Sequence, residues 1–92
     1  MNIQKIMKAI SDSKRRKILF LLKKQNLSAG EISKNFDISF AAISRHLSIL
    51  QDAQLVESER KGKNIIYSLN MSLVEEMLLF INNIFSKDNT NI

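Results

Sequence analysis

The apolar residues of this chain change their spacing twice, and this change limits the folds that the chain can adopt. Over residues 2–53 they recur three and four positions apart, as on one face of a helix. Over residues 56–69 they alternate with polar residues, as in a half-buried strand. The helical spacing returns over residues 71–86. The pattern predicts a mainly α-helical fold with a small β-hairpin before the last helix.

Capping and turn residues divide this pattern into elements. Helices are predicted at 2–10, 13–24, 28–36 and 40–53, strands at 56–60 and 64–69, and a final helix at 72–86. The predicted N-caps are Asp12, Ser28, Ser39 and Ser72. Glu31 and Glu75 complete the spacing of a capping box after two of these serines. Gly62 can take a positive φ in the turn between the strands. The second strand should half-bury one face, made of Ile65, Tyr67 and Leu69.

Length and composition restrict the function further. The 92 residues fit one domain, expected at 1–86, with a frayed tail at 87–92. The net charge of +5 is uneven, because residues 1–63 hold 13 basic and 6 acidic residues, whereas residues 64–92 hold one and three. One His, two Gly, no Pro and no Cys leave few residues for an enzyme, a disulfide framework or a metal site. No signal peptide and no run of about 18 apolar residues is present, so we expect a cytoplasmic binding protein.

The segment Leu27–Leu50 has the layout of a helix-turn-helix. Two short helices joined by a turn at 37–39 can bring together an apolar mini-core of Ile32, Phe36, Ile38, Ile43 and Leu47. The second helix then presents small, polar and cationic residues to a major groove about 12 Å wide. An ordinary helical hairpin is the alternative. The basic β-hairpin that follows, with Arg60, Lys61 and Lys63 near its tip, is typical of a wing and favours a winged helix.

We predict DNA contacts from the second helix of this motif and from the wing. The candidate residues are Ser39, Phe40, Ala41, Ser44, Arg45, His46, Lys61 and Lys63. Arg45 can bond O6 and N7 of guanine or a phosphate, and both remain open. Phe40 can meet a thymine methyl or fold against its own helix, and the two lysines can bind phosphates or stay solvated. The basic run at 14–17 is assigned a background electrostatic role, because charged helix faces are usually solvated. The alternative for Arg15 or Arg16 is an internal pair with an acid such as Asp12 or Asp52.

The last helix carries more apolar surface than one chain can bury. Its apolar residues surround more than half of the helix, which is wider than a core-facing stripe. We therefore predict that the first and last helices pack against a second copy about a two-fold axis. The predicted interface residues are Ile3, Ile6, Met7, Ile10, Leu73, Met77, Phe80, Ile81 and Ile84. A partner protein or a membrane surface is the alternative, although the absence of basic residues before Lys87 disfavours an anionic membrane.

Four stretches carry a resemblance to a known family. They are Ala9–Leu22 (AISDSKRRKILFLL), Leu27–Phe36 (LSAGEISKNF), Ile38–Leu50 (ISFAAISRHLSIL) and Leu55–Asn70 (LVESERKGKNIIYSLN). In this order they resemble the ArsR/SmtB family of winged-helix repressors, and within it the small autorepressors associated with sporulation-delay toxin operons. The resemblance implies a cytoplasmic homodimer whose first and last helices form the interface and whose fourth helix reads DNA. It also implies repression by occupying an operator, often in the protein's own promoter.

The chain departs from that family's pattern in three ways. Ser13 stands where the family often has a helix-starting Pro, and Gln54 stands where it often has Gly. If position 54 is left-handed, Gln costs about 1 kcal/mol relative to Gly. Many relatives sense metals through Cys on the third helix or through Asp, His and Glu on the last helix. Residues 31–35 hold no Cys, and His46 is isolated, so we expect no metal site and no cofactor.

Together, the residues and the resemblance predict a sequence-specific repressor that binds double-stranded DNA as a homodimer on a pseudo-palindromic operator. The expected partners are duplex DNA, a second copy, and an inducer that is either a protein or a small molecule; membrane insertion is not expected. A winged domain whose main partner is another protein is the alternative, and a nucleic-acid enzyme is a distant third. The basic helix face and wing favour DNA.

Overall fold

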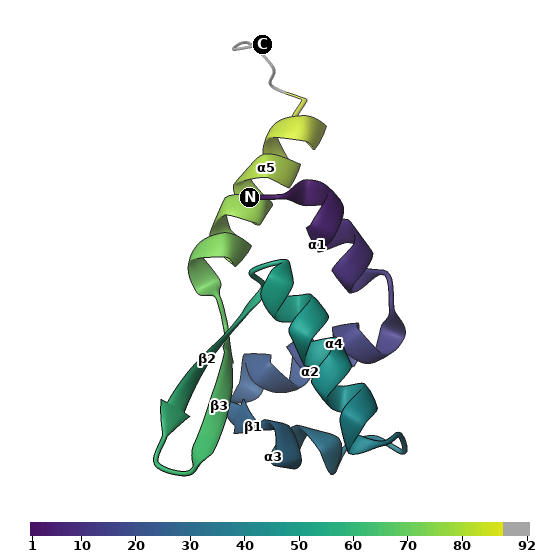
Figure 1. Ribbon diagram of the computed structural model, residues 1–92. Helices are drawn as coiled ribbons and strands as arrows, with labels where there is room; N and C mark the ends of the chain where they lie inside the picture. The colour runs from purple at the N-terminus through teal and green to yellow at the C-terminus, as the bar shows by residue number, and fades with distance from the viewer. Residues whose placement is uncertain (88–92) are drawn as a thin grey trace.

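The computed structural model describes residues 1–87 and confirms the predicted class, with five helices and a β-hairpin before the last one (Figure 1). The elements are α1 (Ile3–Ile10), α2 (Ser13–Lys24), β1 (Leu27–Ser28), α3 (Ala29–Ser33), α4 (Phe40–Asp52), β2 (Val56–Lys61), β3 (Asn64–Leu69) and α5 (Met71–Phe85). The tail predicted at 87–92 lies outside the described residues apart from Lys87. Among the described residues, no helix is long and apolar enough to cross a membrane.

Three of the four predicted helix caps are confirmed. Asp12 accepts two backbone N–H bonds from the first turn of α2, at 2.7 and 3.3 Å. Ser28 and Glu31 form a complete capping box on α3, with bonds of 3.1 and 2.9 Å. Ser39 accepts the N–H of Ala42 at 3.1 Å and starts α4. Local hydrogen bonds therefore fix the start of α4, the second helix of the predicted helix-turn-helix.

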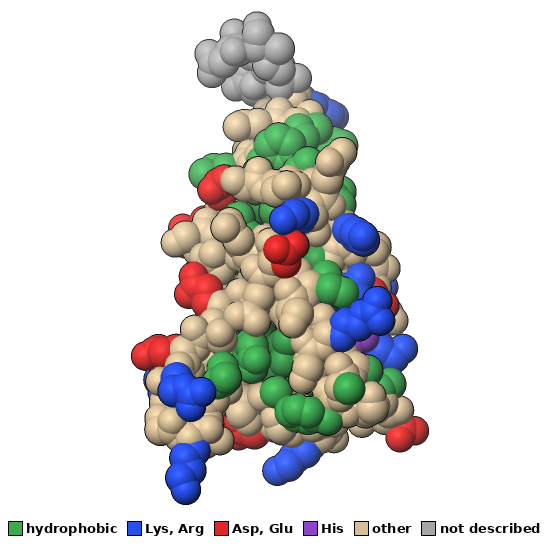
Figure 2. Space-filling model, in the orientation of Figure 1, with side chains coloured by type: hydrophobic (Ala, Val, Ile, Leu, Met, Phe, Trp, Pro, Cys, Tyr) green, Lys and Arg blue, Asp and Glu red, His purple; other side chains and the backbone are tan. Residues whose placement is uncertain are grey.

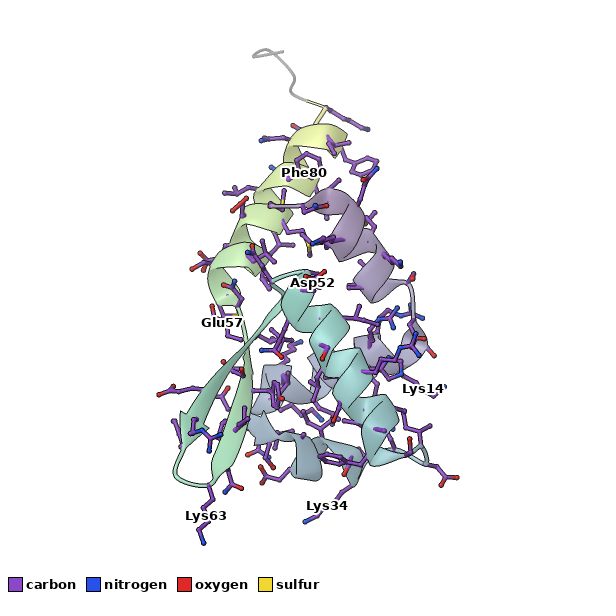
Figure 3. The ribbon with its side chains drawn as sticks, viewed as in Figure 1. Lys14, Lys34, Asp52, Glu57, Lys63 and Phe80 are labelled. Carbon is purple, nitrogen blue, oxygen red and sulfur yellow. The ribbon has the colours of Figure 1, made fainter. Side chains whose placement is uncertain are left out.

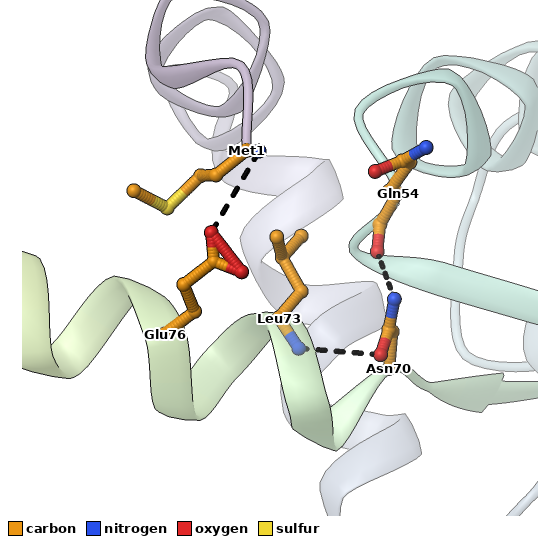
Figure 4. A network of polar contacts seen from close by, with 5 residues as sticks. All are labelled: Met1, Gln54, Asn70, Leu73 and Glu76. Atoms are coloured by element: carbon orange, nitrogen blue, oxygen red, sulfur yellow. Dashed lines mark hydrogen bonds and ion pairs between the residues drawn. The ribbon is translucent and has the colours of Figure 1, made fainter.

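The fourth predicted cap is wrong, because α5 starts two residues earlier than Ser72 predicts. Asn70 is the N-cap, and its Oδ1 accepts the N–H of Leu73 at 3.2 Å (Figure 4). The Nδ2 of the same side chain donates to the carbonyl of Gln54 at 3.0 Å. Gln54 has a φ of 65°, so this position is left-handed, as the glycine common in the family indicates. One side chain thus joins the start of α5 to the loop after α4.

A three-stranded antiparallel sheet replaces the two-stranded hairpin that the sequence predicts. Its order is β1-β3-β2, with Leu27 opposite Tyr67 in the additional pair. Helix α3 is also shorter than predicted, since regular helix ends at Ser33 and a turn continues to Phe36. Ile65 is 41% exposed rather than half-buried, because the end of the hairpin projects beyond the core. Because β1 pairs with β3 and directly precedes α3, it connects the projecting hairpin to the start of α3.

The core draws on all five helices and on β1 and β2, and its largest fully buried side chains come from α1 to α4. The largest are Ile6, Ile18, Ile32, Ile43, Leu47 and Leu50. Leu73 is the buried residue of α5 and Met77 packs against the core, whereas the C-terminal part of that helix extends beyond the core alongside α1 (Figure 1). Ile6 and Leu73 were predicted as interface residues, but they are only 0% and 5% exposed within one chain. They belong to the core of the chain itself, and little of their surface remains for a partner.

Candidate nucleic-acid interface

Helix α4 buries one side and exposes the other. Ile43, Leu47 and Leu50 anchor it in the core. The exposed side carries five small, polar, aromatic or cationic residues: Phe40, Ala41, Ser44, Arg45 and Ser48. These positions follow helical spacing, so they form one continuous strip along the first three turns of α4. Four of them were predicted DNA contacts, and the strip adds Ser48.

The turn before α4 is held by α3 and α2. Phe36 and Ile38 pack against the core, as the predicted mini-core requires. Lys17 donates from Nζ to the carbonyl of Asn35 at 2.6 Å and lies 4.7 Å from the centre of the Phe36 ring. The ammonium of Lys17 therefore binds the turn, so its role is structural and not the background electrostatic role predicted for the basic run. These contacts hold the turn, and with it the N-terminus of α4, against α2 and the core.

The wing, defined here as β2, β3 and the turn between them, ends in exposed lysines. Lys61 closes β2 and Lys63 lies in the turn, separated by Gly62 with a φ of 64°. The predicted positive φ is confirmed, and a Cβ at this position would meet no atom within 4 Å. Figure 3 shows Lys63 at the tip of the wing and Lys34 after α3, both pointing away from the body at the same end of the molecule.

A groove of about 430 Å³ separates the wing from α4. Phe40 and Ser44 line it from α4, and Lys63, Ile65 and Tyr67 line it from the wing. Phe40 is 55% exposed, so its ring is not folded into the core. Arg45 lies on the other flank of α4, in a second groove formed with α1. The predicted contact residues therefore divide between two sides of the same helix.

Arg15 has a structural role, so the background role predicted for it is wrong, and its partners are two carbonyls and an imidazole instead of an acid. The residue is 9% exposed, and its Nε donates to the carbonyl of Ala9 at 2.7 Å. Nη2 donates to the carbonyl of Lys8 at 3.2 Å, and Nη1 lies 3.2 Å from Nδ1 of His46. Since the guanidinium can only donate, Nδ1 of His46 acts as the acceptor and its proton resides on Nε2. Arg16 donates to the carbonyl of Ile10 at 2.7 Å.

His46 is therefore placed differently from the other predicted contacts. It is half-buried, and one of its ring nitrogens faces Arg15 rather than solvent. The imidazole thus joins α4 to the α1–α2 corner, and only its other nitrogen is left for DNA.

The apolar surface predicted on α1 and α5 is exposed in a single chain. Of the predicted interface residues, four are clearly exposed: Met7 (59%), Phe80 (39%), Ile81 (42%) and Ile84 (54%). Ile3, Ile10 and Met77 are half-buried. Outside the predicted set, Leu78, Leu79 and Phe85 are exposed at 59%, 65% and 77%. An ion pair of 3.7 Å between the N-terminus of Met1 and Glu76 joins the two helices (Figure 4).

The family model for bacterial regulatory proteins of the arsR family matches residues 12–58, which include α2, the helix-turn-helix and part of the wing. The chain belongs to the ArsR family. Over 87 residues it is 41% identical to the transcriptional repressor SdpR of Bacillus subtilis, covering 95% of this chain and 97% of that protein. It is also 29% identical to the transcriptional activator HlyU of Vibrio cholerae, over 91% of this chain and 78% of the relative.

Solved structures of the ArsR family have the same fold. An ArsR-like transcriptional regulator from Rhodococcus sp. RHA1 superposes with a TM-score of 0.82 at 29% identity, covering 89% of this chain and 75% of that one. HlyU from Vibrio cholerae superposes with a TM-score of 0.73 at 28% identity, covering 90% of both chains. The resemblance inferred from the four sequence stretches is thus confirmed at the level of family and fold.

Proposed function

We propose that this ArsR-family protein is a transcriptional repressor that binds a pseudo-palindromic operator in double-stranded DNA as a homodimer. The observation that carries the proposal is the exposed strip on α4 beside a wing that ends in two lysines. The assignment as a repressor is supported by the 41% identity to a transcriptional repressor over nearly the whole of both chains. The protein's own promoter is a candidate operator, and the cytoplasm is the proposed compartment.

The exposed side chains suggest a distinct role for each part of the surface. The small residues Ala41 and Ser44 allow the backbone of α4 to approach base edges, and Phe40 is free to meet a thymine methyl. Arg45 reaches a guanine edge or a phosphate, whereas Ser39, beyond its capping bond, is a phosphate donor. The remaining contacts proposed are phosphate bonds from Lys61 and Lys63 and a bond from Nε2 of His46.

Dimerisation is proposed through the apolar surface of α1 and α5. The exposed residues Met7, Ile81 and Ile84 would be covered by the same residues of a second copy, in an isologous interface. Two copies of α4 related by a two-fold axis would enter successive major grooves. Half-site centres would then lie about 34–36 Å apart, or about 10–10.5 base pairs.

The decisive experiment compares base reading with phosphate binding. An operator is first selected from random duplexes by the purified protein. Binding to this duplex and to a scrambled duplex of equal length is then measured by fluorescence anisotropy across a salt series. Arg45→Ala should cost about 1–3 kcal/mol for each base bond that it removes from the operator complex, and should relax the preference at one position of each half-site. Lys63→Ala should weaken both duplexes alike and reduce the salt slope by about one for each phosphate that it leaves unneutralised.

Lys87→Ala is the matched control, because it removes one positive charge two residues after α5 ends at Phe85, and Figure 1 shows α5 leading away from the wing. Equal losses of affinity on both duplexes for Arg45→Ala would make Arg45 a phosphate ligand instead of a base reader. If Arg45→Ala and Lys63→Ala both behave like Lys87→Ala, α4 and the wing do not bind DNA. The alternative of a winged domain that binds a protein partner would then replace the proposal.

A further inference from the structure

Besides the groove next to the wing, a second groove lies along α4 on its other flank, and this one is lined by basic residues. It has a volume of about 360 Å³ and lies between α1 and α4. Its lining residues are Lys5, Lys8, Arg45, Ser48, Ile49 and Asp52. Figure 2 shows Lys and Arg side chains along the side of the molecule where these helices meet. We call this groove the α1–α4 cleft.

The residues of the cleft lie on facing surfaces of its two helices. Lys5 and Lys8 are three positions apart, so they share one side of α1. On α4, the spacing from Arg45 through Ser48 to Asp52 also keeps one side. Arg45 and Ser48 belong to the exposed strip described above as well. The cleft is therefore continuous with the surface proposed to enter the major groove.

Charge in the cleft is positive and only partly neutralised. Asp52 is its one acidic residue, and its Oδ2 lies 3.2 Å from the Nζ of Lys5. Within the described residues, neither Lys8 nor Arg45 has an acidic partner within ion-pair distance. Two positive charges therefore remain for an outside anion. Single charged helix faces are usually only solvated, but here cations from two helices converge on one groove.

The geometry of duplex DNA indicates what this groove would face. A helix in the major groove lies between the two sugar–phosphate backbones that border it. The wing, with Lys63, flanks α4 on one side, and the α1–α4 cleft flanks it on the other. Contacts from the wing alone would leave one of these backbones without a cationic partner. The cleft has the charge and position to supply it.

We propose that the α1–α4 cleft binds the second phosphate backbone of the DNA through Lys8, beside Arg45 of the exposed strip, and that Asp52 limits this binding by holding Lys5. The inference rests on the proposed DNA-binding function and extends the contact surface to α1. It assigns Asp52 a role opposite in sign to that of the lysines, since its carboxylate repels phosphate and occupies an ammonium that would otherwise bind it.

The test uses the full chain, a selected operator duplex and a scrambled duplex, with affinity measured by anisotropy between 50 and 200 mM KCl. In a dimer Lys8→Gln removes two phosphate ligands. The wild-type advantage should therefore be about tenfold larger at 50 mM than at 200 mM salt, on both duplexes alike. Lys8→Arg, which keeps the charge, should restore the wild-type slope. Asp52→Asn should bind both duplexes more tightly than wild type and steepen the salt dependence.

Lys87→Gln is the matched control, and circular dichroism with sedimentation verifies that each variant is folded and in the wild-type oligomeric state. The inference is overturned if Lys8→Gln has the salt slope of Lys87→Gln, or if Asp52→Asn weakens binding. Lys63→Gln separates this failure from failure of the proposed function. A flattened slope for Lys63→Gln alone would refute only the cleft, whereas wild-type slopes for Lys63→Gln and Lys8→Gln together would refute the DNA-binding surface as a whole.

Discussion

Replacing Arg15 by Lys should destabilise the protein far more than the same change at Arg16. Arg15 is 9% exposed, and its guanidinium bonds two backbone carbonyls near the end of α1 and one nitrogen of His46. These three acceptors surround a planar fork, which the single ammonium of Lys cannot reproduce. Arg16 is exposed, and its one bond, to the carbonyl of Ile10, is within the reach of an ammonium.

The size of the effect follows from the hydrogen bonds that the substitution removes. A hydrogen bond from a charged donor contributes about 1.5–3 kcal/mol. If Lys keeps one of the three bonds at position 15, the loss of stability is about 3 kcal/mol at the lower bound. This is a large part of the roughly 5–15 kcal/mol that stabilises a typical domain. The exposed change at position 16 should stay within about 0.5 kcal/mol.

Urea unfolding followed by circular dichroism would measure the difference, at one fixed protein concentration because a dimer's stability depends on it. With a slope of about 1.5 kcal/mol per molar urea, Arg15→Lys should lower the midpoint by about 2 M. The midpoint of Arg16→Lys should stay close to that of wild type. Equal midpoints for the two variants would refute the assignment of Arg15 as the polar centre of the α1–α2 corner.

Three other predictions each depend on a single feature of the structure. Gln54→Gly should stabilise the protein by about 1 kcal/mol and raise Tm by about 4–8 °C, because φ there is 65°, and Gln54→Ala should show no such gain. Asp12 and Glu31 each accept backbone N–H bonds, and these bonds are the main reason why the pKa of Asp12 lies below its ordinary value of 3.8 and that of Glu31 below its ordinary value of 4.5. The two carboxylates therefore contribute their full stabilisation at pH values above 3.8 and 4.5, and this stabilisation is lost as the pH falls through their lower pKa values in the folded state. Asp12→Asn and Glu31→Gln should accordingly flatten the acid limb of urea midpoints measured from pH 6 to pH 2.5. Ile81→Glu should halve the mass seen by sedimentation and weaken operator binding, whereas the neighbouring exposed change Asn83→Glu should do neither.

The features that the sequence predicted correctly depend on neighbours along the chain. An N-cap is recognised by the residue itself and by its position before a helical pattern, so Asp12, Ser28 and Ser39 were found. The same holds for the positive φ at Gly62 and for the limits of β3, whereas β2 runs one residue further than predicted, to Lys61. The strip of exposed residues on α4 followed from helical periodicity, since its buried side was clear from the apolar pattern.

The features that the sequence missed depend on partners far along the chain. β1 has only two residues, too few to show a period, and it exists because Tyr67 and Ile66 of β3 pair with it. Asn70 replaces Ser72 as the cap of α5 because its amide can also donate to the carbonyl of Gln54, sixteen residues earlier. Nothing in the spacing of a capping box reveals that second bond.

Arg15 is an instructive error, because its burial was visible in the helical spacing and was hidden by its charge. It lies three residues before Ile18 and seven before Leu22, so it shares the buried side of α2 with both. A basic residue on such a side must find acceptors, and the carbonyls of Lys8 and Ala9 at the end of α1 provide them. The same guanidinium reaches His46 on α4. The helix that carries part of the proposed dimer surface is therefore fixed to the helix proposed to read DNA through one buried side chain, and a shift of either helix would have to break its bonds.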